Sequence, residues 1–514
     1  MEKIKIAALG ILILFATASL GWSATYYVDA TSGRDTNTGL SQTTAWKTIA
    51  KVNASRFNPG DQILLKRGGI WRETLLAPSS GAPGNPILFG AYGSGNKPTI
   101  MGSDALTLWK NIGGNVWNAT VITEPQVVWF NGTAGTKKTS RSELAIWGDW
   151  YWSSGMVSVY SAAIPTNVEV AVRTNSATSN SRAYLTFENL SFVNGGNGGG
   201  TGGTLVIGSN SSNVQVNSCD FSQAYTCHIG IWGNASGNIG ISNCAFSYSG
   251  LGRIIGSGNA IDVTTTDTAP LVTVEHCTFS KIGNYVGSGY HDHGIYFKAG
   301  RLISRYNYHY DGGIETGASV KISGRAQNGC EIYYNIITAG GGVQSWGVLS
   351  EAGSGHKVYN NVFYGVERGV WQSGPNGPYV PGGSGMTVKN NVFHTTNRYF
   401  IHGAVNTNFV SDYNVFYNGP AVAFLWGTNY YTFDQWKVNT GQDAHSNYTD
   451  PKFSDPIHGS FTLQPSSPCI NAGTNVGLAQ DFIGTLVPLD GYVDIGAFER
   501  IRINPPINVR VNPS

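Results

Sequence analysis

The sequence predicts an all-β fold, a right-handed parallel β-helix in which short strands coil about one long axis. Three observations lead to this prediction: the composition, a repeat of small or polar residues at solenoid spacing, and a second strand that repeats beside it. The 514 residues include 68 glycines, and only 12% are charged. This balance suits short strands joined by many turns and disfavours long surface helices. One solenoid can extend over such a length as a single body.

The first repeat pairs a small or polar residue with an aromatic residue two positions later. Its intervals of roughly 23 to 33 residues match those of known solenoids. Alternate residues of a strand share a face, so both members of the pair should point into the interior. The first member occurs at Leu190, Cys219, Cys244, Cys277, Asn307, Asn335, Asn361, Asn391 and Asn414, and the aromatic member at Phe221, Phe246, Phe279, Phe363, Phe393 and Phe416.

The interior asparagines and cysteines of this repeat call for different explanations. A buried amide is costly unless hydrogen-bonded, so we expect each asparagine to donate to the next along the axis and accept from the previous one. Six cysteines in an exported chain would ordinarily suggest three disulfides. Cys219, Cys244 and Cys277, however, share one slot on neighbouring coils, where strands lie about 4.8 Å apart. We therefore predict that these three are buried free thiols.

A second strand repeats in the same coils and defines an external face. Its second and fourth residues should point inward, and its third and fifth outward. Stacking these strands predicts two outward columns of side chains. The first column contains Gly230, Asp262, Tyr296, Lys321, Leu349, Trp371 and His402, and the second contains Trp232, Thr264, Lys298, Ser323, Glu351, Ser373 and Ala404.

The N-terminus is predicted to be an export signal. Lys3 and Lys5 precede an apolar run over residues 6–18 that is short for a membrane span; an uncleaved N-terminal anchor is the alternative. No later segment looks able to span a bilayer, so we expect a secreted or extracytoplasmic protein. The predicted divisions are a signal peptide (1–24), an N-terminal cap with the first coils and a β-rich, antiparallel insertion (25–185), the β-helix repeats (186–420), C-terminal coils with a closing segment (421–499), and a tail or linker (500–514).

The two ends of the predicted helix carry motifs that resemble those of a known superfamily. The opening contains Tyr26-Tyr27-Val28-Asp29 and Trp46-Lys47-Thr48-Ile49, and the closing segment contains Ser467-Pro-Cys-Ile470 and Asp494-Ile-Gly-Ala-Phe-Glu499. With the repeats, these motifs resemble the pectate-lyase-like β-helix superfamily of secreted bacterial proteins, over nearly the whole mature chain. The resemblance implies a carbohydrate-active protein, since members are mostly polysaccharide lyases, glycoside hydrolases and epimerases, alongside adhesins and phage tail proteins. No signature of the polygalacturonases or alginate lyases is matched, and fold alone does not assign a reaction.

The outward columns gather the candidate site residues. Lysines suit acidic sugars and aromatic faces suit sugar rings; a solvated outer face with ordinary charges is the alternative. The candidate catalytic residues are Lys321, Lys298, Tyr296 and Arg325, and the candidate substrate-binding residues are Asp262, Glu351, Trp232, Trp371, His402, His291, Asp292 and His293. His228 is expected to face outward as well, without a functional role.

Spacing favours one chemistry over another on this face. Hydrolysis usually needs two carboxyl groups about 5 to 9.5 Å apart, whereas Asp262 and Glu351 should lie three coils apart, on the order of 14 Å. A lyase for uronate-containing polysaccharides instead needs a cation for the substrate carboxylate, a base and an acid. Either lysine would be the base if a neighbouring cation lowers its pKa, with the other lysine or Arg325 binding the carboxylate and Tyr296 as the acid.

Two other function classes remain open from the sequence. One is a non-catalytic carbohydrate-binding or cell-surface protein, and the other a hydrolase or epimerase with its site elsewhere on the solenoid. A polysaccharide is the expected partner, and a net charge of +2 without a basic stripe argues against nucleic acid. We expect a monomer. No metal site is predicted: the run 291–293 could supply a base or bind a metal, and turns containing Asp267, Asp311 and Glu315 could hold calcium, but none has a calcium-ligand spacing.

Overall fold

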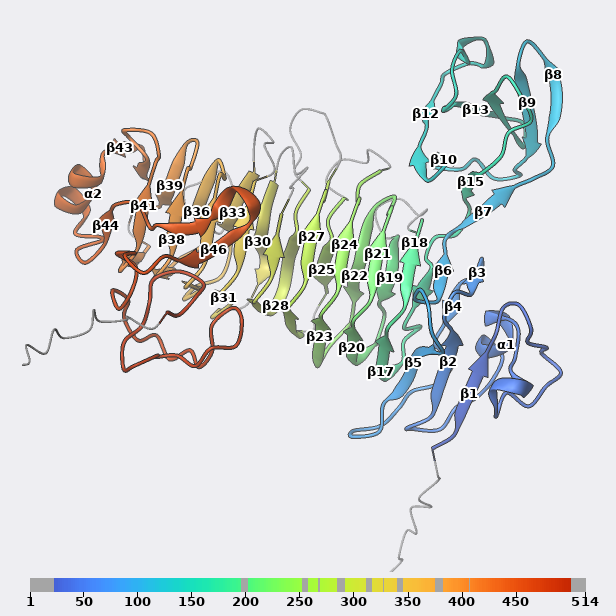
Figure 1. Cartoon of the computed structure of the whole chain (residues 1–514), viewed down its shortest axis with the longest axis horizontal. Coiled ribbons are helices and arrows are strands. Elements are labelled where there is room, and N and C mark those ends of the chain that lie inside the picture. The colour runs from blue at the N-terminus through green and yellow to red at the C-terminus, as the bar shows by residue number, and fades with distance from the viewer. Residues whose placement is uncertain are drawn as a thin grey trace, which may run out of the picture.

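The computed structural model describes residues 23–195, 202–251, 258–266, 269–283, 292–310, 317–326, 328–339, 345–374, 382–405 and 407–500, with the side chain of Arg325 excepted. Three parallel sheets, here called A, B and C, run along one solenoid, as Figure 1 shows. Successive strands of the chain pass from sheet A to B to C and then begin the next coil. The predicted parallel β-helix is confirmed.

Each sheet is built from one short strand per coil. Sheet A contains β1 (Thr25–Val28), β2 (Gln62–Lys66), β5 (Ile87–Tyr92), β17 (Ala183–Glu188), β20 (Ser212–Asn217), β23 (Asn238–Ser242), β26 (Leu271–Glu275), β31 (Glu331–Tyr333), β34 (Lys357–Tyr359), β37 (Thr387–Lys389) and β40 (Val410–Asp412). Sheet B contains β3 (Ile70–Trp71), β6 (Thr99–Met101), β18 (Ser191–Val193), β21 (Asp220–Ser222), β24 (Ala245–Ser247), β27 (Thr278–Ser280), β29 (Tyr308–His309), β32 (Ile336–Thr338), β35 (Val362–Tyr364), β38 (Val392–His394), β41 (Val415–Tyr417) and β44 (Asn447–Tyr448).

Sheet C carries the predicted external face. Its strands are β4 (Leu75–Leu76), β16 (Ala177–Thr178), β19 (Gly203–Ile207), β22 (Cys227–Gly233), β25 (Ile261–Thr265), β30 (Gly317–Ala326), β33 (Ser345–Ser350), β36 (Arg368–Gln372), β39 (Tyr399–Gly403), β42 (Phe424–Trp426) and the antiparallel β43 (Asn429–Tyr431). One long strand, β28 (Ile295–Arg305), pairs in sheet C at its start and in sheet A at its end.

The buried asparagines form the predicted ladder at the start of sheet B. Asn307, Asn335, Asn361 and Asn391 each donate a backbone N–H and a side-chain N–H to the Oδ1 of the next asparagine, at 2.9–3.1 Å, ending on Asn414. All are fully buried. Because every Oδ1 accepts two bonds from one coil only, a slipped coil would leave several buried polar groups unpaired.

The other two interior stacks also follow the predicted register. Phe192, Phe221, Phe246 and Phe279 stack face to face with centroids 5.0–5.1 Å apart, and His309 continues the stack at 4.2 Å. Cys219, Cys244 and Cys277 occupy the position of the ladder asparagines in three earlier coils, and they are buried and free. The other three cysteines of the chain are also buried and free. A column of aromatic rings and thiols therefore fills the early coils, where the asparagine ladder has not yet begun.

An antiparallel lobe interrupts the early coils. Figure 1 shows it projecting from the N-terminal end of the solenoid. One of its sheets contains β7 (Ser103–Leu106), β10 (Val128–Phe130), β11 (Thr133–Ala134) and β15 (Val168–Ala171), and the other β8 (Lys110–Gly113), β9 (Val116–Thr120), β12 (Thr136–Lys137), β13 (Asp149–Ser153) and β14 (Met156–Tyr160). We call residues 103–171 the lobe. It has its own core, which includes Phe130, Trp150 and Val157.

The ends of the solenoid are covered by short helices. Helix α1 (Ile49–Asn53) buries Ile49 and Val52 at the N-terminal end. Helix α2 (Phe433–Thr440) covers the opposite end, starting with a capping box at Thr432 and burying Trp436, whose indole donates to the buried Asp443 at 2.7 Å. Short 3-10 turns occur at Gln42–Thr44, Arg141–Glu143 and Pro456–His458. In the described part of the chain, no helix is long and apolar enough to cross a membrane.

The closing segment lies along the side of the solenoid rather than over its end. After α2 the chain forms β45 (Phe453–Asp455) and β46 (Ser460–Leu463) and then packs Cys469, Ile495 and Phe498 against outward residues of sheet B such as Val362 and Val392. Asn360 and Asn390, one residue before the ladder positions, donate to the carbonyls of Asp494, Gly496 and Thr474. In each Asn-Asn pair, one amide therefore stabilises the interior and the other holds the closing segment.

Replacement of a central ladder residue should cost much more than replacement of a surface asparagine. Asn361→Ala leaves the backbone N–H of Asn335 and the carbonyl of Ile332 without these partners in a buried site, so we expect a loss of about 3 kcal/mol in the free energy of unfolding. Urea-induced unfolding followed by tryptophan fluorescence measures it. The exposed Asn96 is the matched control, and Asn96→Ala should change the free energy by less than about 0.5 kcal/mol. Equal losses in both variants would contradict the ladder's role.

The closing segment should loosen as the pH rises. Burial, and then the charge of Asp494, raise the pKa of Glu499 to about 8, and burial raises the pKa of Asp494 to about 6. Because both values lie above those of the unfolded chain, the folded state binds protons more tightly. Its stability should therefore fall between about pH 4.5 and pH 8, as measured by thermal unfolding across that range.

The matched variants for this pH dependence are Glu499→Gln and Asp490→Asn. The first removes the buried titrating group and should flatten the slope. The second changes an exposed carboxylate outside this cluster and should leave the slope as it is. A slope that is unchanged in Glu499→Gln would show that the pH dependence arises elsewhere.

Candidate functional site

The first outward column of sheet C has the predicted register, whereas strand pairing joins the second only from Trp232 to Thr264. Strand pairing joins Gly230 to Asp262, Asp262 to Tyr296, and Tyr296 to Lys321. It continues from Lys321 through Leu349 and Trp371 to His402. The functional role of these residues remains a prediction.

Two lysines meet over one phenol ring in the middle of this face. Lys298 Nζ lies 4.1 Å from the centroid of the Tyr296 ring, and Lys321 Nζ lies 5.2 Å from it. The register of β28 and β30 shifts between Phe297 and Ala299, where Lys298 lies. Two lysine side chains therefore share one aromatic ring and lie within reach of one substrate group.

Lys321 is held in place by a carboxylate. Its Nζ lies 3.1 Å from Glu351 Oε1, and the side chains are only 10% and 4% exposed. Glu351 Oε2 accepts a hydrogen bond from Ser323 at 3.0 Å. This pair holds the Lys321 ammonium at one position on the face, which suits it to binding an anionic group.

Asp262 is the centre of a hydrogen-bonded network on the neighbouring coils. Its carboxylate accepts from Thr264 at 2.8 Å and from Asn259 at 3.0 Å, and also from Trp232. Burial raises its pKa, and the charge of Lys298 opposes that shift. Asn259 Oδ1 in turn accepts from the backbone N–H of His293 at 2.7 Å. The network therefore joins the Asp262 carboxyl to the His293 backbone.

His293 and Asp292 are buried beside this network. His293 Nδ1 accepts from the backbone N–H of Ala318 at 2.9 Å, which places the proton of the neutral ring on Nε2. The His293 ring packs on Tyr296 with centroids 4.9 Å apart. Asp292 accepts from Gly258 N–H at 2.8 Å, and burial raises the pKa of Asp292 to about 6. His291 and the side chain of Arg325 lie outside the described residues.

Sequence reasoning missed a third outward column, three residues before the first. Here Trp346 pairs with Arg368, and Arg368 pairs with Tyr399. The guanidinium of Arg368 lies 4.8–5.6 Å from the ring centroids of Trp346, Trp371 and Tyr399. Trp371 also stacks on His402 at 4.8 Å, and burial lowers the pKa of His402 to about 3. Each residue of this column lies three positions before a residue of the first column, and this constant spacing in the sequence would have revealed it.

The prediction that His228 faces outward is wrong. Its ring is fully buried against Phe221 and Phe246, with centroids 6.1 and 5.9 Å apart, and burial lowers its pKa to about 3. The chain turns from sheet B into sheet C here, so two consecutive residues point inward instead of alternating. Later coils place Gly347 and Gly369 in this slot, where a Cβ would lie 2.4 Å from a phenylalanine ring.

The calcium expectation is not tested by the structure. Asp267, Asp311 and Glu315 all lie outside the described residues. Within the described ranges, no group of three or more His, Cys, Asp or Glu side chains is arranged to hold a metal ion.

Comparisons with known proteins support the fold. Residues 259–438 match a family model described as the right handed beta helix region. A structure titled "The complex structure of XylC with xylose" aligns over 92% of this chain and 98% of that chain, with TM-score 0.56 and 13% identity. A structure titled "Glycoside hydrolase" aligns over 79% of this chain and 96% of that chain, with TM-score 0.55 and 11% identity. At these identities the likeness concerns the fold alone.

One curated relative shares a short segment. A stretch of 116 residues is 34% identical to lacto-N-biosidase of Bifidobacterium longum subsp. longum. The match covers 18% of this chain and 7% of that protein. The chain therefore corresponds to a small part of that relative's length.

The buried ion pair should respond differently to single and double substitution. Lys321→Ala leaves Glu351 buried without its ammonium partner, so we expect a loss of about 3 kcal/mol in the free energy of unfolding. The double variant Lys321→Met/Glu351→Gln removes both charges and should recover most of that loss. Urea denaturation of the wild type and the single and double variants measures the coupling.

The more exposed pair of Lys357 and Glu331, 3.3 Å apart, is the matched control. Lys357→Ala should cost less than about 1 kcal/mol, since water screens exposed pairs. If Lys321→Ala costs no more than this control, the pair does not rigidify the face.

Proposed function

We propose that the chain binds an acidic, uronate-containing polysaccharide along the outer face of sheet C and cleaves it by β-elimination. The observation that carries the proposal is the pair of lysines over Tyr296. A uronate carboxylate needs a cation at a fixed position, and the Lys321 ammonium is fixed by Glu351. Farther along the column, Trp371 and His402 stack on each other and form an aromatic border for neighbouring sugar rings.

The elimination assigns one role to each group. Lys321 binds the substrate carboxylate and stabilises the charge that develops when the C5 proton leaves. The neutral amine of Lys298 takes that proton, the released electron pair forms the C4–C5 double bond, and the bond from C4 to the leaving oxygen breaks. Tyr296 donates its phenolic proton to the leaving oxygen. Asp262 lies within electrostatic reach of Lys298, and its own carboxyl is held in place by Thr264 and Asn259.

Glycoside hydrolysis is the second candidate, favoured by a different observation. Burial raises the pKa of both Asp262 and Asp292, and a carboxyl group that titrates near pH 6 suits a general acid. The named relatives that share the fold include a glycoside hydrolase and a protein solved with xylose. Hydrolysis would use Asp292 as the acid and Asp262 as the second carboxylate.

One incubation distinguishes the two reactions. The chain is incubated with alginate, pectate and glycosaminoglycans while ultraviolet absorbance and new reducing ends are followed together. Elimination predicts both signals, because each cleavage creates a conjugated double bond and a reducing end. We expect Lys298→Ala and Lys321→Ala to lower the rate by at least about 100-fold.

The exposed lobe residue Lys110 is the matched control, and Lys110→Ala should retain the wild-type rate. Absence of the double-bond signal on every uronate polymer would refute elimination. Reducing ends without absorbance, lost in Asp292→Asn, would establish hydrolysis instead. Binding without either product would mean that the face only recognises the polymer.

A further inference from the structure

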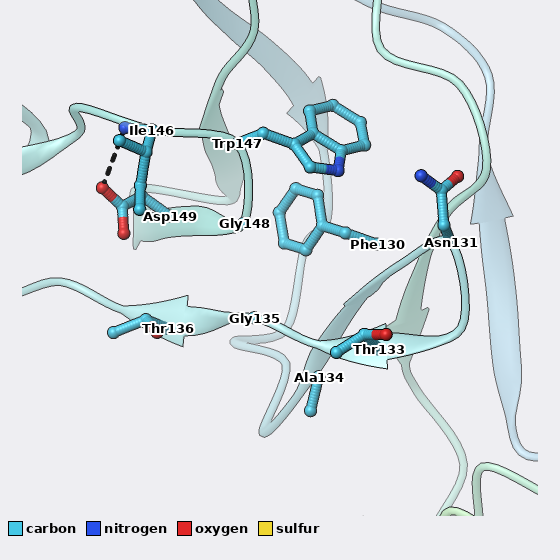
Figure 2. A pocket seen from close by; sticks show the side chains of 10 residues that line it. All are labelled: Phe130, Asn131, Thr133, Ala134, Gly135, Thr136, Ile146, Trp147, Gly148 and Asp149. Carbon is cyan, nitrogen blue, oxygen red and sulfur yellow. Dashed lines mark hydrogen bonds between the residues drawn. The ribbon is translucent and has the colours of Figure 1, made fainter.

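The lobe contains a cavity of about 370 Å³ that the reaction at sheet C does not use. It opens between the β10–β11 hairpin and the loop that leads into β13, and its walls include Phe130, Asn131, Thr133 and Trp147. Figure 2 shows the Trp147 and Phe130 rings between Asp149 on one side and Asn131 on the other. A volume of this size lies within the range of small-ligand sites, roughly 300 to 1,000 Å³.

The loop that carries Trp147 is held rigidly by a buried carboxylate. Asp149 is 2% exposed, accepts the backbone N–H groups of Ala145 and Ile146 at 3.0 and 3.2 Å, and pairs with Lys138 at 2.9 Å. These contacts fix the backbone on both sides of Trp147. The backbone that carries the indole is therefore held in place before a ligand arrives.

Two glycines shape the walls of the cavity, Gly135 by allowing close approach and Gly148 by its backbone conformation. A Cβ at Gly135 would lie 2.4 Å from both the Gly148 carbonyl oxygen and the Phe130 ring. Gly148 has a φ of +103°, a conformation that side-chain-bearing residues rarely adopt. The shape of the cavity thus depends on glycine at both positions.

The aromatic residue at the mouth is more exposed than the lobe's own packing requires. Trp147 is 39% exposed and meets Phe130 edge to face at 5.0 Å, and the neighbouring Ile146 is 66% exposed. The lobe core is closed without them by Phe130, Trp150 and Val157. Exposed apolar side chains on a rigid loop are typical of a ligand-binding or protein-binding surface.

The side chains that line the cavity indicate which class of ligand it binds. Asp149 is the one charged residue among the described lining residues, and Lys138 already neutralises it. The exposed side chains of Asn131 and Thr133 line the same cavity as the indole and supply an amide and a hydroxyl. An aromatic face with neutral hydrogen-bonding groups fits an uncharged pyranose ring, whereas a uronate would find no free cation among these residues.

We propose that this cavity binds a neutral sugar residue, with its C–H face on Trp147 and its hydroxyl groups on Asn131 and Thr133. The lobe then acts as a second carbohydrate site beside the acidic-sugar site of sheet C. The ligand class is inferred from the lining residues alone. The proposal therefore does not depend on whether the site on sheet C catalyses elimination, catalyses hydrolysis or only binds a polymer.

Calorimetric titration of the full chain with xylohexaose, cellohexaose and mannohexaose tests the proposal. We expect at least one of the three to bind, and Trp147→Ala to weaken that binding at least about tenfold. Thr133→Val keeps the branched shape of the side chain and removes the hydroxyl, so it should weaken binding more modestly. Lys298→Ala should leave it unchanged, which separates this site from sheet C.

The matched control is Ile122→Ala, because Ile122 is an exposed apolar residue of the lobe, 85% exposed, away from the cavity walls. Thermal unfolding of each variant checks that the lobe stays folded. The proposal is overturned if no neutral hexasaccharide binds, if Trp147→Ala binds as the wild type does, or if Ile122→Ala loses binding equally.

Discussion

A column of buried amides fixes the register on which the later coils depend. Each ladder asparagine after Asn307 accepts two hydrogen bonds from the coil before it, and its own amide donates to the coil after it. Parallel coils joined by short turns would otherwise slip by one residue, and such a slip would exchange the inner and outer faces of every strand. The aromatic stacks reinforce the register but do not define it, because rings tolerate sliding more readily than directional hydrogen bonds do.

The fixed register turns residues far apart in the sequence into neighbours on one face. Tyr296 and Lys321 lie on adjacent coils and meet because their strands pair position for position. The fold tolerates charges here because they are paired, as in Lys321 with Glu351, or lie over aromatic rings, as Lys298 does over Tyr296. The solenoid supplies a straight, rigid base, and the chemistry arises from what each coil presents at equivalent outward positions.

Sequence periodicity was sufficient for the regular part of the molecule and failed where the chain bends. The two-residue spacing of Asn361 and Phe363, repeated in other coils, predicts which side chains point inward, and the structure agrees. At the turn from sheet B into sheet C, two consecutive residues point inward, so His228 is buried and the column of Trp346, Arg368 and Tyr399 was missed. The sideways packing of the closing segment depends on contacts between Asn360 and residues more than 130 positions away, which no local pattern encodes.

The central claim is that the register brings Lys298, Lys321 and Tyr296 together to bind an acidic sugar, and a crystal structure with a bound uronate trisaccharide tests it most directly. The account predicts a substrate carboxylate within salt-bridge distance of Lys321 Nζ and a sugar ring lying along the column toward Trp371. It also predicts that the C5 hydrogen of the same sugar faces Lys298 Nζ. A trisaccharide bound on another face of the solenoid, or bound here with its carboxylate turned away from both lysines, would contradict it.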